Sequence, residues 1–152
     1  MNRVWTYIIS RELNPSELQQ LQQMGEAFVK SWTAHEVQLH AEFSIFKNRI
    51  MLVKVNENIH EASGCSIDKL SHFVKQAEKQ FNTELLNRLL VALKLDNKIQ
   101  IVHSSKIKDM LLQGAINENT TVYNTALGHE DELNIWEQAL KNTWLNKYLV
   151  TN

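Results

Sequence analysis

The chain is poor in the residues that mark many specialised proteins. Its 152 residues include one cysteine, one proline and four glycines. A single cysteine cannot form an intramolecular disulfide, so the fold does not depend on an oxidising compartment. The scarcity of proline and glycine leaves no flexible linker, and no internal repeat or low-complexity segment is present. These absences favour an ordinary folded protein in a reducing cytoplasm.

Long apolar runs are also missing. The stretch from Val4 to Ile9 is too short for the core of a signal peptide and is followed by Arg11 and Glu12. The longest later run, Leu89 to Leu93, falls far below the roughly 20 apolar residues that a membrane-spanning helix needs. We therefore expect a cytoplasmic protein that neither crosses a membrane nor is secreted.

Charge of one sign is not in excess. Lys and Arg number 16 against 17 Asp and Glu, so the formal net charge is -1. This balance gives no electrostatic reason to expect a nucleic acid or an anionic membrane as partner. With 43% hydrophobic and 22% charged residues, the composition is that of a globular protein. The length fits one domain, which we predict to span residues 1–152.

The first half of the sequence predicts strands and helices in alternation. The aromatic and β-branched residues from Val4 to Ile9 indicate a strand. Asn14, Pro15 and Glu17 then form a strong helix start, because they combine a cap, a first-turn proline and an acid three residues after the cap. The following apolar residues have helical spacing. Two runs of alternating apolar residues predict a hairpin over 39–45 and 51–55.

The second half continues the pattern. We predict a helix from about residue 65 to Phe81, strands over 85–95 and 98–103, a short helix through Leu112, a strand over 120–125 and a closing helix after Gly128. The order β-α-β-β-α-β-β-α-β-α predicts an α+β fold with a mainly antiparallel sheet. Its first six elements match the order of ferredoxin-like folds.

Cys65 stands where a loop passes into the second helix, and it allows three interpretations. Free N–H groups at a helix start favour a thiolate, so Cys65 is a candidate nucleophile or redox thiol. Its general base would be a histidine brought near by folding, and the candidates are His60, His103 and His40. The same N–H groups can instead bind an anion. In the simplest interpretation Cys65 packs as a small apolar residue at a helix start that Ser66 and Asp68 cap.

The anion-site interpretation defines a set of predicted ligand-binding residues. Arg88 joins this set because its guanidinium can pair with an anion or with a carboxylate near the helix start, although an outward-facing arginine is the simpler interpretation. The set is Ser63, Gly64, Ser66, Asp68 and Arg88.

No metal or cofactor site is predicted. His35, Glu36 and His40 superficially resemble the His-Glu-x-x-His zinc helix, but the second histidine is five residues from the first. Five residues turn a helix by about 140°, so the two rings would not share a face. A lone cysteine with scattered histidines also lacks the ligand spacing of structural zinc.

Two aromatic residues near the end of the chain suggest a surface for association. Trp144 and Tyr148 are four residues apart on the predicted closing helix or just after it. They form either part of the core or an exposed apolar patch for self-association.

The sequence resembles a family of small proteins of Bacteroidetes-type bacteria to which no reaction is assigned. The likeness covers nearly the whole chain and is carried by four stretches: 4–7, 63–68, 114–116 and 121–124. Members are sometimes labelled ABC transporter ATPases. That label requires the phosphate-binding loop Gly-x-x-x-x-Gly-Lys-Ser/Thr, and no glycine of this chain begins such a motif. The resemblance thus implies a bacterial cytoplasmic protein and supplies no activity.

The sequence therefore favours a small cytoplasmic binding protein, whose partner is another protein or a small anionic ligand at residues 64–68. The alternative is a cysteine-dependent enzyme or thiol sensor that uses Cys65.

Overall fold

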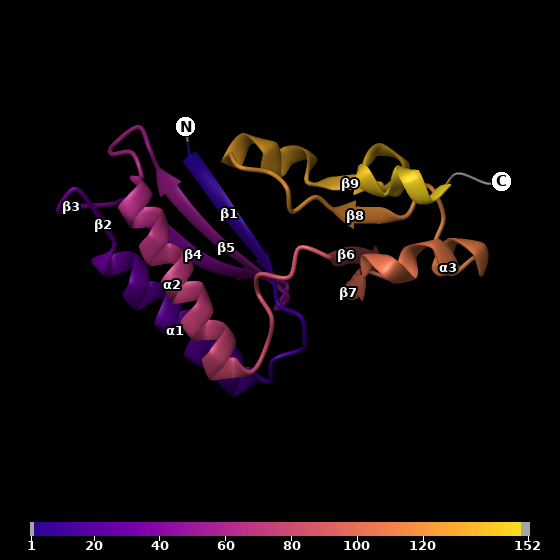
Figure 1. Cartoon of the computed structure of the whole chain (residues 1–152), viewed down its shortest axis with the longest axis horizontal. Helices are drawn as coiled ribbons and strands as arrows, with labels where there is room; N and C mark the ends of the chain where they lie inside the picture. Colours follow the sequence, from indigo (N-terminus) through magenta and orange to yellow (C-terminus); the bar gives the residue numbers. More distant parts are fainter. Residues whose placement is uncertain (1, 150–152) are drawn as a thin grey trace.

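The structure, a computed structural model, describes residues 2–149, with residue 134 described by its backbone alone. The first half contains an antiparallel sheet in the order β1-β5-β4, formed by β1 (Asn2–Ile8), β4 (Ala41–Phe46) and β5 (Ile50–Asn56). Two long helices, α1 (Pro15–Ser31) and α2 (Gly64–Phe81), cover one face of this sheet (Figure 1). After α1 the chain forms a short hairpin of β2 (Thr33–Ala34) and β3 (Val37–Gln38).

The second half contains another antiparallel sheet, in the order β7-β6-β8-β9. Its strands are β6 (Leu90–Leu95), β7 (Lys98–His103), β8 (Thr121–Tyr123) and β9 (Glu137–Ala139). The helix α3 (Ile107–Leu112) and several short 3-10 helices complete this half. In Figure 1 the two sheets lie side by side, with α1 and α2 on the first and α3 on the second.

Three apolar clusters hold these layers together. The first joins α1 and α2 to the helix-facing side of the first sheet. The second joins the opposite side of that sheet to residues of the second half, among them Ala92, Tyr123 and Trp136. The third lies between the second sheet and α3 with the C-terminal 3-10 helices. The first sheet is therefore buried on both faces, which explains the nearly continuous apolar sequence of β5.

The predicted start of α1 is confirmed in detail. The Asn14 side chain accepts a hydrogen bond from the backbone N–H of Glu17, at 2.8 Å, and the Glu17 carboxylate accepts one from the N–H of Asn14, at 3.0 Å. Pro15 occupies the first helical position, where its missing N–H costs nothing.

Gly25 allows α1 to lie very close to the sheet. A Cβ atom at this position would be 2.3 Å from the ring of Phe43 on β4. Phe43 is itself buried in the first cluster, so the ring has little room to move. The glycine therefore sets the distance between α1 and β4.

Two tight hairpin turns join neighbouring strands, one turn in each of the two large sheets. Lys47 and Asn48 join β4 to β5, and Asp96 and Asn97 join β6 to β7. All four have positive φ, between 46° and 64°. Two consecutive residues of this kind form the turn whose twist matches that of antiparallel strands, and Asn and Asp adopt it with little strain.

The α+β class is confirmed, but the ferredoxin-like arrangement of the first six elements is wrong. In that fold the fourth strand would join the first sheet, whereas β6 pairs with β7 and β8 in a separate sheet. The free edge of β1 is instead occupied by the segment before residue 130. The N–H of Val4 donates to the carbonyl of Gly128 at 2.9 Å, and Arg3 forms a β-bridge with His129.

The predicted strand over 85–95 is too long, because β6 begins only at Leu90. The Glu78 carboxylate on α2 accepts hydrogen bonds from the N–H groups of Leu85 and Leu86, at 2.8 and 3.1 Å. These bonds hold the chain in a turn at the C-terminal end of α2.

The predicted closing helix is also wrong. A 3-10 helix over Glu130–Ile135 leads into β9, which pairs with β8. The apolar residues at helical spacing do not share one face: Leu133 and Trp136 pack into the second cluster and Leu140 into the third. A strand at this position pairs with β8 and covers its otherwise open edge.

The single domain predicted over residues 1–152 stays a prediction, and its ends, residues 1 and 150–152, lie outside the described residues. Within residues 2–149, no helix combines the length and the apolar character needed to cross a membrane.

Candidate functional site

The predicted helix start at Cys65 is shifted by two residues. Ser63, and neither Cys65 nor Ser66, is the N-cap of α2. Its hydroxyl accepts the N–H of Ser66 at 3.1 Å, and the Ser66 hydroxyl accepts the N–H of Ser63 at 2.7 Å. The N–H of Ile67 donates to the Ser63 carbonyl at 2.9 Å. Several N–H groups of the proposed anion site are thus bonded within the chain.

Ser66 serves packing at this corner. It is fully buried, and its carbonyl accepts the indole N–H of Trp32 at 2.8 Å. Gly64, Cys65 and Asp68, in contrast, are exposed on the first turns of α2. The corner therefore consists of a buried junction between α1 and α2 beside an exposed thiol.

Two of the candidate histidines, His60 and His103, have hydrogen-bond partners other than Cys65. Nε2 of His60 lies 3.1 Å from the carbonyl oxygen of Ala34. His103 ends β7 in the other sheet, where its Nδ1 pairs with Ser105. In the described part of the chain, no hydrogen bond joins Cys65 to a histidine. The Cys–His hydrogen bond that a cysteine-dependent mechanism uses is therefore absent from the described residues, and the catalytic interpretation of Cys65 stays a prediction.

Arg88 also lies away from the start of α2. It is exposed in the segment before β6 and borders a small pocket with Arg3 and Tyr7 of β1. Its charge is close enough to Tyr7 to lower the pKa of that phenol, against the larger raising effect of burial. Neither Arg88 nor Asp68 forms an ion pair within residues 2–149.

The two aromatic residues near the C-terminus do not form one exposed patch. Trp144 is 42% exposed. Tyr148 packs against the third cluster, and the ammonium of Lys147 lies 5.2 Å from the centre of its ring. Trp144 therefore presents a large apolar surface to solvent near this end.

A site that the sequence did not suggest lies at Arg49, the first residue after the turn between β4 and β5. Its side chain is only 12% exposed. One terminal nitrogen, Nη2, donates to the carbonyls of Ile9 and Ser10 at 3.2 and 3.5 Å. The other, Nη1, is 4.0 Å from the carboxylate of Glu12, which is 86% exposed.

The guanidinium of Arg49 is short of partners for its burial. Its Nε is buried and has no hydrogen-bond partner in the described part of the chain. Burial lowers the pKa of Arg49, and the nearby charge of Glu12 only partly opposes this effect. A buried cation with a distant, solvated counter-ion pays a desolvation cost that the fold leaves largely uncompensated.

Arg49 borders a pocket of about 560 Å³ in which the two hairpin turns meet the start of α1. The turn between β4 and β5 contributes Lys47 and Asn48, and the turn between β6 and β7 contributes Asn97 and Lys98. Three cationic side chains therefore line the pocket, against the single carboxylate of Glu12. Lys47 has a weak partner in the hydroxyl of Tyr123, at 3.5 Å, and Lys98 is exposed.

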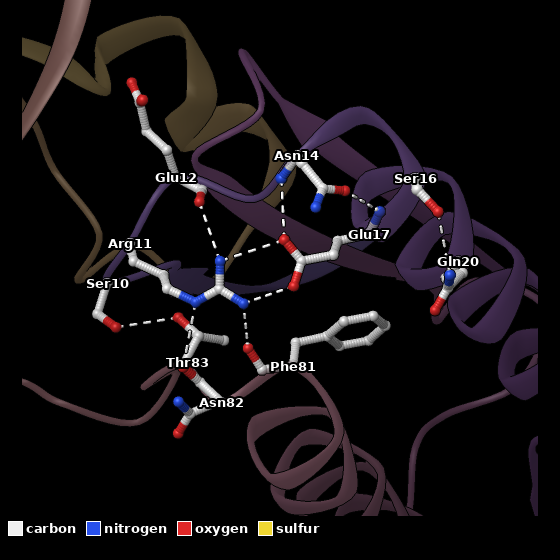
Figure 2. Close-up of polar contacts among 10 residues, drawn as sticks. All are labelled: Ser10, Arg11, Glu12, Asn14, Ser16, Glu17, Gln20, Phe81, Asn82 and Thr83. Atoms are coloured by element: carbon white, nitrogen blue, oxygen red, sulfur yellow. Dashed lines mark hydrogen bonds and ion pairs between the residues drawn. The ribbon is translucent and has the colours of Figure 1, made fainter.

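Arg11, the residue before Glu12, shows how this fold satisfies an arginine (Figure 2). Two nitrogens bind the two carboxylate oxygens of Glu17, at 3.2 and 2.5 Å. Further bonds reach the carbonyls of Glu12, Phe81 and Asn82, so the side chain ties the start of α1 to the end of α2. These hydrogen bonds raise the pKa of Arg11 and lower that of Glu17.

The sequence offered only one signal for the Arg49 pocket. The run Lys47-Asn48-Arg49 indicates a turn with two cations, but nothing in it shows that the turn at 96–97 lies beside it. Among the residues that the structure describes, no group of three or more His, Cys, Asp or Glu is placed to hold a metal ion.

Compared with known proteins, the chain matches no family model, no curated protein and no solved structure.

Proposed function

We propose that this protein binds a small anionic ligand, a carboxylate or phosphate compound, in the pocket beside Arg49. The observation that carries the proposal is the Arg49 guanidinium, whose buried Nε has no partner and whose contact with the Glu12 carboxylate is 4.0 Å long. Arginine binds carboxylates and phosphates through charge-assisted hydrogen bonds, which are among the strongest polar contacts in proteins.

The position of Glu12 suggests how the ligand enters. Its exposed carboxylate is the only acidic group among the described residues that border the pocket, and its contact with Nη1 of Arg49 is long. An exposed side chain of this kind swings into solvent at little cost. A ligand oxygen then takes its place against Arg49, while Lys47 and Lys98 neutralise the remaining charge.

The size and the lining of the pocket fit a small molecule. A volume of about 560 Å³ lies within the usual range of ligand sites. Leu13, Pro15 and Leu18 supply an apolar wall, and the side-chain amides of Asn48 and Asn97 supply hydrogen-bonding groups. This combination favours a ligand with an anionic head and a short organic body.

The pocket replaces the start of α2 as the favoured anion site. At that start Ser63 and Ser66 already satisfy each other, whereas at Arg49 the buried Nε lacks a partner. A cysteine-dependent reaction at Cys65 stays the alternative. Its setting in either case is the bacterial cytoplasm, as the family resemblance and the lone cysteine suggest.

Isothermal titration with two probes, succinate and inorganic phosphate, tests the proposal at constant ionic strength. We expect saturable binding of at least one probe, and a loss of affinity of about tenfold or more in Lys98→Gln, because a hydrogen bond to a charged group is removed. Lys108→Gln on α3 is the matched control, since it removes the same charge at an exposed position outside the pocket. Equal losses in both variants, or no saturable binding of either probe, would contradict the proposal.

A further inference from the structure

A second, smaller cavity of about 220 Å³ lies against β1, on the side where the segment 125–128 covers its edge. Residues 3–7 of the strand border it, and among them Arg3, Trp5 and Tyr7 have side chains on one face of the sheet. Arg88 borders it from the segment before β6. Its lining residues therefore include two arginines and no acidic residue.

Neither guanidinium is neutralised within residues 2–149, where the ion pairs involve other cations. The nearest acid after the covering segment, Glu130, is already bound to Lys54, at 3.0 Å, and to Asn2. The two arginines thus concentrate positive charge at the cavity, which attracts a counter-ion.

Arg3 is held in place without using its hydrogen-bond donors. Its guanidinium carbon lies 4.7 Å from the centre of the Trp5 ring, in a cation–π contact. Such a contact occupies the flat face of the guanidinium and leaves the N–H groups at its rim free to bind. Trp5 is fixed in turn by Trp32, whose ring centre is 5.8 Å away.

Tyr7 adds a neutral donor to the cavity. Its side chain is 7% exposed, and burial raises its pKa to about 12 although Arg88 lowers it. The phenol therefore keeps its proton at physiological pH and can donate one hydrogen bond. Thr6, in contrast, donates its hydroxyl to the carbonyl of Thr125, at 2.9 Å, and is already satisfied.

From this arrangement we infer a second anion site, in which Arg3, Arg88 and the hydroxyl of Tyr7 bind a compact oxyanion. The cavity is smaller than the range usual for organic ligands, so it fits an inorganic phosphate or a short carboxylate and excludes the larger ligand proposed for the Arg49 pocket. The inference rests on residues that the Arg49 pocket does not share.

Titration of the ¹⁵N-labelled protein with inorganic phosphate or acetate, at constant ionic strength, tests the inference. We expect saturable shifts of the backbone amides of residues 4–7 and 126–128. In Arg88→Gln and in Arg3→Gln the affinity should fall by about tenfold or more, because each removes a charge-assisted hydrogen bond. The two probes distinguish a phosphate site from a carboxylate site.

Variants elsewhere separate this site from general charge effects. Lys108→Gln removes one positive charge outside the cavity, and Lys98→Gln removes one from the Arg49 pocket. Both should leave the shifts of residues 4–7 unchanged, and Tyr7→Phe should weaken binding less than either arginine variant does. Unchanged affinity in both folded arginine variants, or an equal loss in Lys108→Gln, would overturn the inference. If the arginine variants lose affinity as expected while Lys98→Gln has no effect on succinate or phosphate binding, only the proposed Arg49 site is refuted.

Discussion

Arg11 lies in the segment that joins β1 to α1, and Arg49 donates hydrogen bonds to that segment, yet the two guanidinium groups differ in how many of their donors have partners. Arg11 is 40% exposed by its side chain and has a bidentate carboxylate partner together with three backbone carbonyls. Arg49 is 12% exposed and has two carbonyls, with a carboxylate only at 4.0 Å. The more buried cation is thus the less compensated one.

This difference separates architecture from function. The bonds of Arg11 join the start of α1 to the C-terminal end of α2, where helix dipoles also favour a positive charge. An arginine whose donors are all used holds the fold together and has nothing to offer a ligand. An arginine that is largely buried and has a donor without a partner can still bind an anion in the neighbouring pocket.

A side chain at position 25 should disturb the surroundings of both Arg11 and Arg49, more than any other change considered. Gly25→Ala places a methyl group against the ring of Phe43, so α1 must move away from β4. Because α1 carries Glu17 and one wall of the pocket, we expect a loss of about 1–3 kcal/mol in the free energy of unfolding, the usual cost of overpacking a core. Denaturant unfolding measures it. Unchanged stability would show that the helix adapts and that the spacing is not critical.

Substituting each arginine by methionine sharpens the comparison. At a ligand concentration ten times the Kd, a bound anion stabilises the native protein by about 1.4 kcal/mol and raises its Tm by about 3–6 °C. We expect Arg49→Met to lose this rise, with its stability without ligand changed by less than about 1 kcal/mol, because a costly buried charge is removed together with its bonds.

Arg11→Met should do the reverse: it should lower the Tm without ligand and retain the rise on adding succinate or phosphate. Thermal unfolding gives the Tm of each variant with and without the ligand. Loss of the ligand effect in both variants would contradict the division of roles.

The acid dependence of stability should distinguish the Arg11 region. The hydrogen bonds from Arg11 and from the Asn14 N–H lower the pKa of Glu17 in the folded state. A lowered pKa means that the unfolded state binds the proton more tightly, so the stabilisation is present above the ordinary pKa of glutamate and is lost as the pH falls through the folded value. Glu17→Gln should flatten the decline of stability below about pH 4.5. An identical decline in the variant would show that other carboxylates cause it.

The smallest effect concerns the cavity beside β1. Because burial raises the pKa of Tyr7 to about 12, the folded state holds the phenolic proton more tightly than the unfolded state. This contribution to stability is complete below about pH 10 and declines as the pH rises from there to about 12. Tyr7→Phe should remove that decline, and urea unfolding at pH 9 and pH 11 checks it. A decline of equal size in the variant would assign it to other groups.

Local features of the fold were predictable from the sequence, and contacts between distant segments were not. The cap at Asn14, the first strand and the turn at Asp96 and Asn97 follow from neighbouring residues, and the structure confirms them. The second sheet was missed because the segment 125–129 occupies the edge of β1, a contact between residues more than 120 positions apart. The closing helix was wrong because Leu133 and Leu140 pack into different clusters.

The candidate site was less predictable for the same reason. Cys65 was a candidate because it is the single cysteine, but the hydrogen bonds between Ser63 and Ser66 form the helix start beside it. Arg49 has no distinguishing neighbour in sequence. Its importance arises from burial beside Ile9 and from the approach of the turn at Asn97, both of which are tertiary contacts.

Side-chain NMR can test directly whether Arg49, and not Arg11, binds the anion. In ¹H–¹⁵N spectra of arginine side chains, titration with succinate or phosphate at constant ionic strength should shift the Nε–Hε signal of Arg49 to saturation. The signal of Arg11, whose Nε already donates to the carbonyl of Asn82, should stay in place. An Arg49 signal that does not move with either anion, or equal shifts of both signals, would contradict the account.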